Sequence, residues 1–208
     1  MLICIITALP PLISKEQTLS TGTIKFSSDY TKASMIDDQK SLLLSGDAWI
    51  ITNSTTIQAD SIKISGKDSR NISCEGSVSI DDSQQGISLT SNKLTYDRKL
   101  SLLRIDGWAE MEDKNHGIIA KGAYLENSQQ TGITLIQISV RIFKDTDDGP
   151  MVCLTDSALY DSNTQHLEMT GNSVVYWKNS IYKASRISID LEHNEITLEG
   201  KVKGTIHE

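Results

Sequence analysis

A pattern of apolar and polar residues recurs along the chain with a period of about thirty-one residues. Glycines mark the repeats at Gly46, Gly76, Gly107, Gly171 and Gly200, and the glycine expected between the third and fourth of these is replaced near Ile138. The residues two and four positions before each glycine are apolar, as Leu42 and Leu44 illustrate. Alternation of this kind predicts a strand that buries one face.

A second apolar set follows each glycine and has the same strand-like spacing. In the first repeat this set comprises Ile57, Ala59, Ile62 and Ile64, and related residues follow in the later repeats. In the fourth repeat we place Val152, Leu154 and Leu159 on the buried face, after a turn at Lys144 to Pro150. We expect the glycines to lie on the buried face too, where a strand bends or is approached closely.

These repeats predict an all-β fold, specifically an elongated β-jellyroll of two facing antiparallel sheets built from two-strand repeats of about thirty-one residues. A strand pair with one apolar face cannot bury that face alone, so stacked neighbours must enclose a long slot between them. We expect residues 22–206 to form a single domain with very little helix.

The first residues of the chain have a different character. Residues 1–14 form an apolar segment interrupted by Pro10 and Pro11, and they resemble the hydrophobic part of a signal peptide. The segment is shorter than the stretch of about 20 residues that spans a membrane. We therefore expect an exported protein, with an uncleaved membrane anchor as the alternative if the natural chain begins further upstream.

Composition excludes several function classes. The net charge of -7, without a basic stripe, argues against a nucleic-acid partner. The four histidines lack metal-ligand spacing, paired aspartates such as Asp81 and Asp82 fall at expected turns, and no nucleotide or hydrolase motif occurs. We expect no catalytic residue, no metal and no cofactor.

The cysteines and tryptophans are assigned structural roles. Cys74 falls on the predicted buried face and Cys153 between two predicted inward residues, so we expect two buried or half-buried thiols and no disulfide. Trp49 and Trp108 lie at odd offsets from the repeat glycines. Trp177 lies near a register shift, where Val174 and Tyr176 compete with Ser173 and Val175 for the buried face. We expect all three tryptophans to face outward.

Several stretches of the sequence resemble one family. They are Ile24-Lys-Phe-Ser-Ser-Asp29, Leu43-Leu44-Ser45-Gly46-Asp47-Ala48, Ile57-Gln-Ala-Asp60-Ser-Ile-Lys-Ile64, Cys74-Glu-Gly76-Ser-Val78, Leu94-Thr-Tyr96-Asp97, Gly107-Trp-Ala-Glu110 and Leu167-Glu-Met-Thr-Gly171-Asn172. In order and spacing they are similar to the LptA/OstA family of periplasmic lipopolysaccharide-transport proteins, over roughly residues 22–204. The resemblance implies a β-jellyroll that shields the acyl chains of lipopolysaccharide or another glycolipid in the periplasm.

The resemblance also implies partners. These would be same-fold transport components at the inner and outer membranes, together with head-to-tail self-assembly through terminal strands. The strand edges expected to serve this assembly contain Ile24, Phe26, Ile196, Leu198 and Val202. The wall residues expected to contact lipid are Ile50, Ile57, Ile62, Ile64, Ile80, Leu89, Leu94, Met111, Ile118, Leu125, Ile142, Leu154, Ile187 and Ile189.

Alternatives from other classes remain open at the level of sequence. The chain could be the membrane-anchored component of the same machinery, a structural β-repeat protein of the envelope whose slot is plain core, or a saccharide-active β-solenoid enzyme. Co-purifying lipid would favour the carrier, and an interior filled only by side chains would favour the structural protein. Acidic side chains that converge in an exterior cleft would favour the enzyme.

Overall fold

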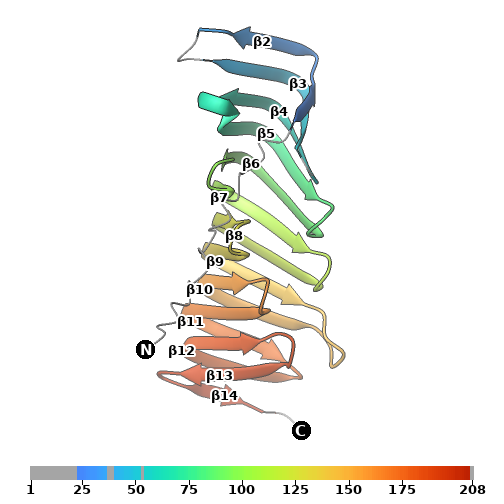
Figure 1. The fold of residues 1–208 in the computed structure, drawn as a ribbon. Helices are drawn as coiled ribbons and strands as arrows, with labels where there is room; N and C mark the ends of the chain where they lie inside the picture. The colour runs from blue at the N-terminus through green and yellow to red at the C-terminus, as the bar shows by residue number, and fades with distance from the viewer. Residues whose placement is uncertain (1–22, 37–39, 53, 207–208) are drawn as a thin grey trace, which may run out of the picture.

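The computed structural model describes residues 23–36, 40–52 and 54–206, so the segment 1–14 lies outside the described residues. The described residues form one sheet of fourteen antiparallel strands. Figure 1 shows these strands stacked along the long axis of an elongated molecule, from β2 at one end to β14 at the other. The fold is all-β, as the sequence predicts, and Lys67–Ser69 (η2) is the only helical turn among the described residues.

The long strands follow one another in chain order. They are β3 (Ser41–Thr52), β4 (Thr55–Ser65), β5 (Asn71–Asp82), β6 (Ile87–Asp97), β7 (Leu102–Asp113), β8 (Ile118–Ser128), β9 (Ile133–Lys144), β10 (Met151–Asp161), β11 (His166–Trp177) and β12 (Ser180–Asp190). Each pairs with the next, so one repeat of the sequence is two strands and two turns. The turn expected at Lys144 to Pro150 lies between β9 and β10, as predicted.

The two ends of the stack are built from short strands. β1 (Ile24–Ser27) pairs with the second half of β3, and β2 (Tyr30–Ser34) pairs with its first half. At the other end, β13 (Glu195–Glu199) pairs with the second half of β12, and β14 (Lys203–Thr205) pairs with its first half. The sheet is therefore not closed, and each end presents the edges of two short strands.

Each long strand changes register near its middle, and there it bends. In β3 the pairing with β4 shifts between Ser45 and Ala48, and Gly46 and Asp47 at that point have φ values of 74° and 40°. Such left-handed residues form a β-bulge, which turns the strand sharply. One strand consequently contributes its first half to one wall of the slot and its second half to the other wall.

The glycines at the bends do not lie on the buried face, contrary to expectation. A Cβ atom added to Gly46 would approach the carboxylate of the exposed Asp29 within 2.6 Å, and one added to Gly171 would approach that of the exposed Asp156 within 2.7 Å. The positive φ reverses the direction of the missing side chain relative to the regular alternation. These glycines permit the bend, and the absence of a side chain leaves space for the neighbouring exposed aspartate.

Ile138 occupies the bend of β9, where the repeat lacks its glycine. Its φ is 66°, that of the next residue Ser139 is 55°, and its side chain is 60% exposed. A β-branched residue is disfavoured in this left-handed region, because its Cβ is close to the backbone carbonyl. The bend is preserved here against the local preference of the sequence.

The inward side chains form one continuous apolar cluster from Leu44 to Leu191. Trp49 and Trp108 are not part of it, but Trp177 is buried and belongs to it, which corrects the expectation that all three tryptophans face outward. In β11 the register after the bend places Ser173, Val175 and Trp177 inward. Among the residues that the structure describes, no helix is long and apolar enough to span a membrane.

Candidate functional site

The space between the two walls, called the slot below, contains nearly all of the predicted wall residues. Thirteen are buried, each at most 6% exposed: Ile50, Ile57, Ile62, Ile64, Ile80, Leu89, Leu94, Met111, Ile118, Leu125, Ile142, Ile187 and Ile189. Cross-strand pairs such as Ile50 with Ile57 and Ile80 with Leu89 bring them together into rows along the stack. Their contact with lipid stays a prediction.

Leu154 is the exception, and its placement in the wall was wrong. In β10 the buried residues are Met151, Cys153, Thr155, Ala158 and Tyr160, so Val152, Leu154 and Leu159 face outward. The error arises because both faces of β10 are apolar. On the outer face Val152 pairs with Phe143 and Tyr176, and Leu154 pairs with Val174. Alternation alone cannot identify the buried face of such a strand.

The two described cysteines are free and buried, as predicted. The sequence pattern placed Cys74 inward and Cys153 outward, but in the structure both side chains point inward. Cys74 lies on β5 and Cys153 on β10, five strands apart in the sheet. Burial raises the pKa of each thiol to about 12. Neither thiol is therefore an activated nucleophile, and both act as small apolar side chains of the walls.

Two rows of turns border the slot along one side. The first row contains the turns that follow odd-numbered strands from β3 to β11, and the second row contains those that follow even-numbered strands from β4 to β12. Backbone bonds connect successive turns within a row, for example Lys114 N to Gly86 O at 2.9 Å and Arg98 N to Arg70 O at 2.9 Å. The opening between the two rows is called the mouth.

The mouth is hollow near the N-terminal end of the stack. A cleft of about 590 Å³ lies there, and residues from both rows of turns contribute to its lining. Thr52 and Asp82, at the ends of β3 and β5, are its buried polar residues. Its full lining is Thr52, Ser54, Thr55, Lys67, Asp68, Arg70, Asp82, Gln84, Gln85, Tyr96, Arg98, Lys99, Ser101 and Gln129.

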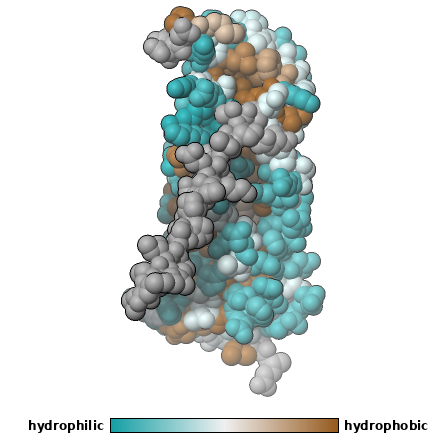
Figure 2. All heavy atoms as spheres, in the orientation of Figure 1, coloured by the Kyte–Doolittle hydropathy of each residue, from teal (hydrophilic) through white to brown (hydrophobic). Residues whose placement is uncertain are grey.

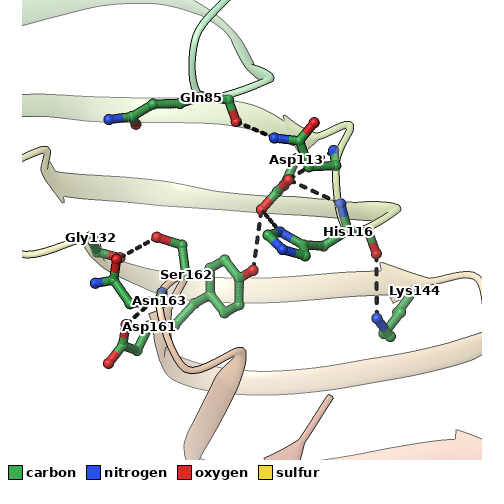
Figure 3. A network of polar contacts seen from close by, with 10 residues as sticks. Gln85, Asp113, His116, Gly132, Lys144, Asp161, Ser162 and Asn163 are labelled. Carbon is green, nitrogen blue, oxygen red and sulfur yellow. Dashed lines mark hydrogen bonds and ion pairs between the residues drawn. The ribbon is translucent and has the colours of Figure 1, made fainter. Parts of the chain in front are cut away.

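One side-chain hydrogen bond connects the two rows further along the mouth, and a histidine supports it. Tyr160 of β10 donates a hydrogen bond of 3.2 Å to Oδ2 of Asp113 at the end of β7, and the same oxygen lies 2.7 Å from Nδ1 of His116 (Figure 3). Asp113 is buried, and its Oδ1 accepts bonds from the backbone of Asn115 and His116. We call Asp113, His116 and Tyr160 the clasp. Burial, followed by the nearby Asp113 carboxylate, raises the pKa of Tyr160.

The predicted edge residues lie at the two ends of the stack. Phe26 and Val202 are exposed, whereas Ile24, Ile196 and Leu198 are half-buried against the core. The exposed Tyr30 and Ile206 lie near the same two ends. In Figure 2 apolar residues are visible at both ends of the molecule, and polar residues cover much of the flank between them.

The basic side chains at the mouth were largely missed from sequence. In the sequence, the basic residues considered as contacts for lipid phosphates at the rim of the slot are Lys25, Lys32, Lys40, Arg98, Arg104 and Lys121. Lys67, Arg70 and Lys99 were not among them, and they lie in turns whose position depends on the stacking of the repeats. Arg104 and Lys121 were considered too, but they form ion pairs with Glu126 and Glu110 away from the cleft. A signal was available in hindsight, because basic residues recur just after β4 and β6, in the same row of turns.

No group of three or more potential metal ligands occurs among residues 23–36, 40–52 and 54–206. The paired acids at the expected turns have structural roles where they are described. Asp82 accepts bonds from Ser54 and Thr55 and from the backbone of Gln84 and Gln85. That no residue is catalytic stays a prediction.

The amino-acid sequence matches no protein-family model and no curated protein sequence. Among solved structures it is similar to LptH, the LptA-homologous periplasmic component of the lipopolysaccharide transport device from Pseudomonas aeruginosa. The match covers 90% of this chain and 96% of that chain, with 7% sequence identity and a TM-score of 0.29. This solved structure comes from the family that the sequence motifs resemble.

Proposed function

We propose that the protein is a periplasmic carrier that shields the acyl chains of lipopolysaccharide or another glycolipid in its slot on the way to the outer membrane. The observation that carries this proposal is the single apolar cluster, which continues from Leu44 to Leu191 beneath a polar mouth. Apolar burial contributes about 0.8 kcal/mol per methylene, so a lipid needs no special side chain to be retained there. The mouth gives acyl chains a lateral route between the walls.

The ends of the stack support a chain of such slots. Strand edges with exposed apolar residues add strands from a partner when the partner offers a complementary edge. Phe26 on β1 is such a residue at one end, and at the other end the exposed Val202 directly precedes β14 rather than lying on a strand, as was expected of it. The partners are same-fold transport components of the two membranes, or further copies of this chain joined head to tail.

Photocrosslinking from inside the slot tests the carrier function. A photoreactive benzoylphenylalanine at Leu89, which is buried, is expected to crosslink to lipid in living cells. The matched control carries the same residue at the neighbouring Thr90, which is exposed on the opposite face of β6. Mass spectrometry of the adduct identifies the lipid. Equal lipid adducts from both positions, or none from a folded Leu89 variant, would contradict the carrier function.

A structural role is the second candidate, and tight packing of the interior favours it. Leu44, Ile50 and Ile62 are completely buried by the protein itself, so a lipid must separate the walls to enter. A structural protein would leave the walls closed at all times. Extraction with organic solvent distinguishes the carrier from the structural protein. Stoichiometric lipid from protein purified without detergent supports the carrier. Lipid-free protein, together with no lipid crosslink from the Leu89 position, supports the structural role.

A further inference from the structure

The cleft at the mouth has a positive excess of charge on an acidic protein. Four of its lining residues are basic (Lys67, Arg70, Arg98 and Lys99) and two are acidic (Asp68 and Asp82); with Asp97, the ion-pair partner of Arg70, the local excess is 4 − 3 = +1. The whole chain has a net charge of -7. Charge of one sign collected in a cleft with walls of low dielectric raises the local concentration of the opposite ion.

The buried acid of the cleft is already occupied. Asp82 accepts hydrogen bonds from the hydroxyls of Ser54 and Thr55 at 2.9 and 3.0 Å. Backbone N–H groups of Gln84 and Gln85 donate to the same carboxylate at 3.0 and 3.1 Å. These four donors belong to the first row of turns, so Asp82 holds that row in place and has little capacity left to pair with a lysine across the mouth.

The two arginines are held in fixed positions. Arg70 donates from Nε and from one terminal nitrogen to Asp97, with a shortest N to O distance of 2.6 Å, and this pairing lowers the pKa of Asp97. Arg98 donates from one terminal nitrogen to the carbonyls of Asp68 and Ser69 at 3.3 and 3.2 Å. The guanidinium group of Arg70 has five N–H donors, more than its bonds to Asp97 use.

The two lysines provide the charge that is not neutralised. Lys67 and Lys99 are exposed, and neither makes an ion pair with any other described residue. They lie in neighbouring turns of the second row, which are joined by the backbone bond from Arg98 N to Arg70 O at 2.9 Å. Two ammonium groups beside two anchored guanidinium groups suit an anion with several oxygens, above all a phosphate.

We propose that this cleft binds the phosphorylated headgroup of an amphiphile whose acyl chains lie in the slot below. The cleft of about 590 Å³ has the size of a small-molecule site and accommodates a phosphorylated sugar. It borders the slot directly, because Thr52 and Asp82 end the strands that contain the buried Ile50 and Ile80. This inference rests on the proposed carrier function and adds the chemistry of the headgroup.

Binding of two amphiphiles with the same tail tests the inference. Dodecyl phosphate and dodecyl maltoside are titrated below their micelle concentrations into the full chain and followed by calorimetry. We expect the phosphate amphiphile to bind about tenfold more tightly, as charge-assisted hydrogen bonds allow. The variant Lys67→Gln/Lys99→Gln should lose this preference and retain its affinity for dodecyl maltoside. The control Lys63→Gln/Lys183→Gln removes two exposed lysines from strands instead of turns and should retain the preference.

The outcomes separate the headgroup site from the slot. Equal binding of the two amphiphiles, or a preference that survives in Lys67→Gln/Lys99→Gln, overturns the headgroup site and leaves the carrier intact. Binding of neither amphiphile overturns the carrier function and the headgroup site together. Glucose 1-phosphate, titrated alone, should bind much more weakly than dodecyl phosphate; equal affinity would make the cleft a site for soluble phosphates and contradict an amphiphilic ligand.

Discussion

The hydroxyl of Tyr160 donates a hydrogen bond of 3.2 Å to Oδ2 of Asp113, although the two residues belong to strands that are not neighbours in the sheet. The strands β8 and β9 lie between β7 and β10 in the sheet order, so the bond crosses the slot and connects the two rows of turns. It closes the mouth at the clasp, whereas residues from both rows line an open cleft near the N-terminal end.

Tyr160→Phe is expected to destabilise the protein by about 1–2 kcal/mol, because the bond goes to a buried carboxylate. His116 and two backbone N–H groups still satisfy Asp113 in the variant, which limits the loss. Urea unfolding followed by circular dichroism measures it. Tyr176→Phe, at an exposed position of β11, is the matched control and should be neutral. Equal stability of Tyr160→Phe and the wild type would show that the clasp contributes nothing.

Ile138→Gly is expected to stabilise the protein by about 1 kcal/mol, since glycine removes the strain of a left-handed β-branched residue. Little apolar burial is lost, because the isoleucine side chain is 60% exposed. The midpoint of urea unfolding should rise. As a control, Gly76→Ala introduces a Cβ at a bend that has φ of 76° and should lower the midpoint. A lower midpoint for Ile138→Gly would mean that its side chain has a packing role.

Cys74 and Cys153 are expected to resist thiol reagents in the native protein. With a pKa of about 12, the thiolate fraction at pH 8 is about one part in ten thousand, and burial blocks access. Ellman's reagent applied to a Cys4→Ser variant should report almost no thiol before denaturant is added and two afterwards. Rapid reaction of one native thiol would indicate that the walls open readily, and recovery of fewer than two would indicate a disulfide.

His193 is expected to titrate above its usual value, since Nδ1 lies 3.0 Å from Oδ2 of Asp190 and this hydrogen bond raises the pKa of the imidazole. A raised pKa in the folded state means that the pair stabilises the protein below the unfolded value of about 6.5, and the gain is lost as the pH rises through the folded pKa. An NMR titration measures the midpoint. In Asp190→Asn it should move down toward 6.5; an unchanged midpoint would remove Asp190 as the cause.

Phe26→Asp and Val202→Asp should each weaken head-to-tail association, because a charge on the edge strand β1, or directly before the edge strand β14, opposes strand addition. Both side chains are exposed, so the fold should be retained. Sedimentation velocity over a range of concentrations measures the association. Thr90→Asp, which introduces the same charge at an exposed position of β6 in the interior of the sheet, is the control. Association that persists in the double variant Phe26→Asp/Val202→Asp would place the contact elsewhere on the protein.

Apolar residues on the outer face of the sheet are the reason that the sequence pattern assigned some side chains to the wrong face. The repeat pattern predicts the inward positions of most strands, as Ile57 and Ile62 show, because polar residues alternate with them. On β10 both faces are apolar, so Leu154 was assigned to the wrong face. Trp177 was assigned outward for a related reason, since β11 offered two competing registers, and the pairing of Val175 with Cys153 and Tyr182 decides between them.

The sequence by itself determined the two-strand repeat, the apolar walls and the positions of the bends, since these follow from local alternation and from residues such as Gly46 and Gly171. Only the tertiary structure decided which turns face one another. The contact between Asp113 and Tyr160 and the gathering of Lys67 and Lys99 around one cleft depend on stacking and on the bend angle of every strand. Such long-range geometry arises from the summed packing of many side chains, and no short stretch of sequence encodes it.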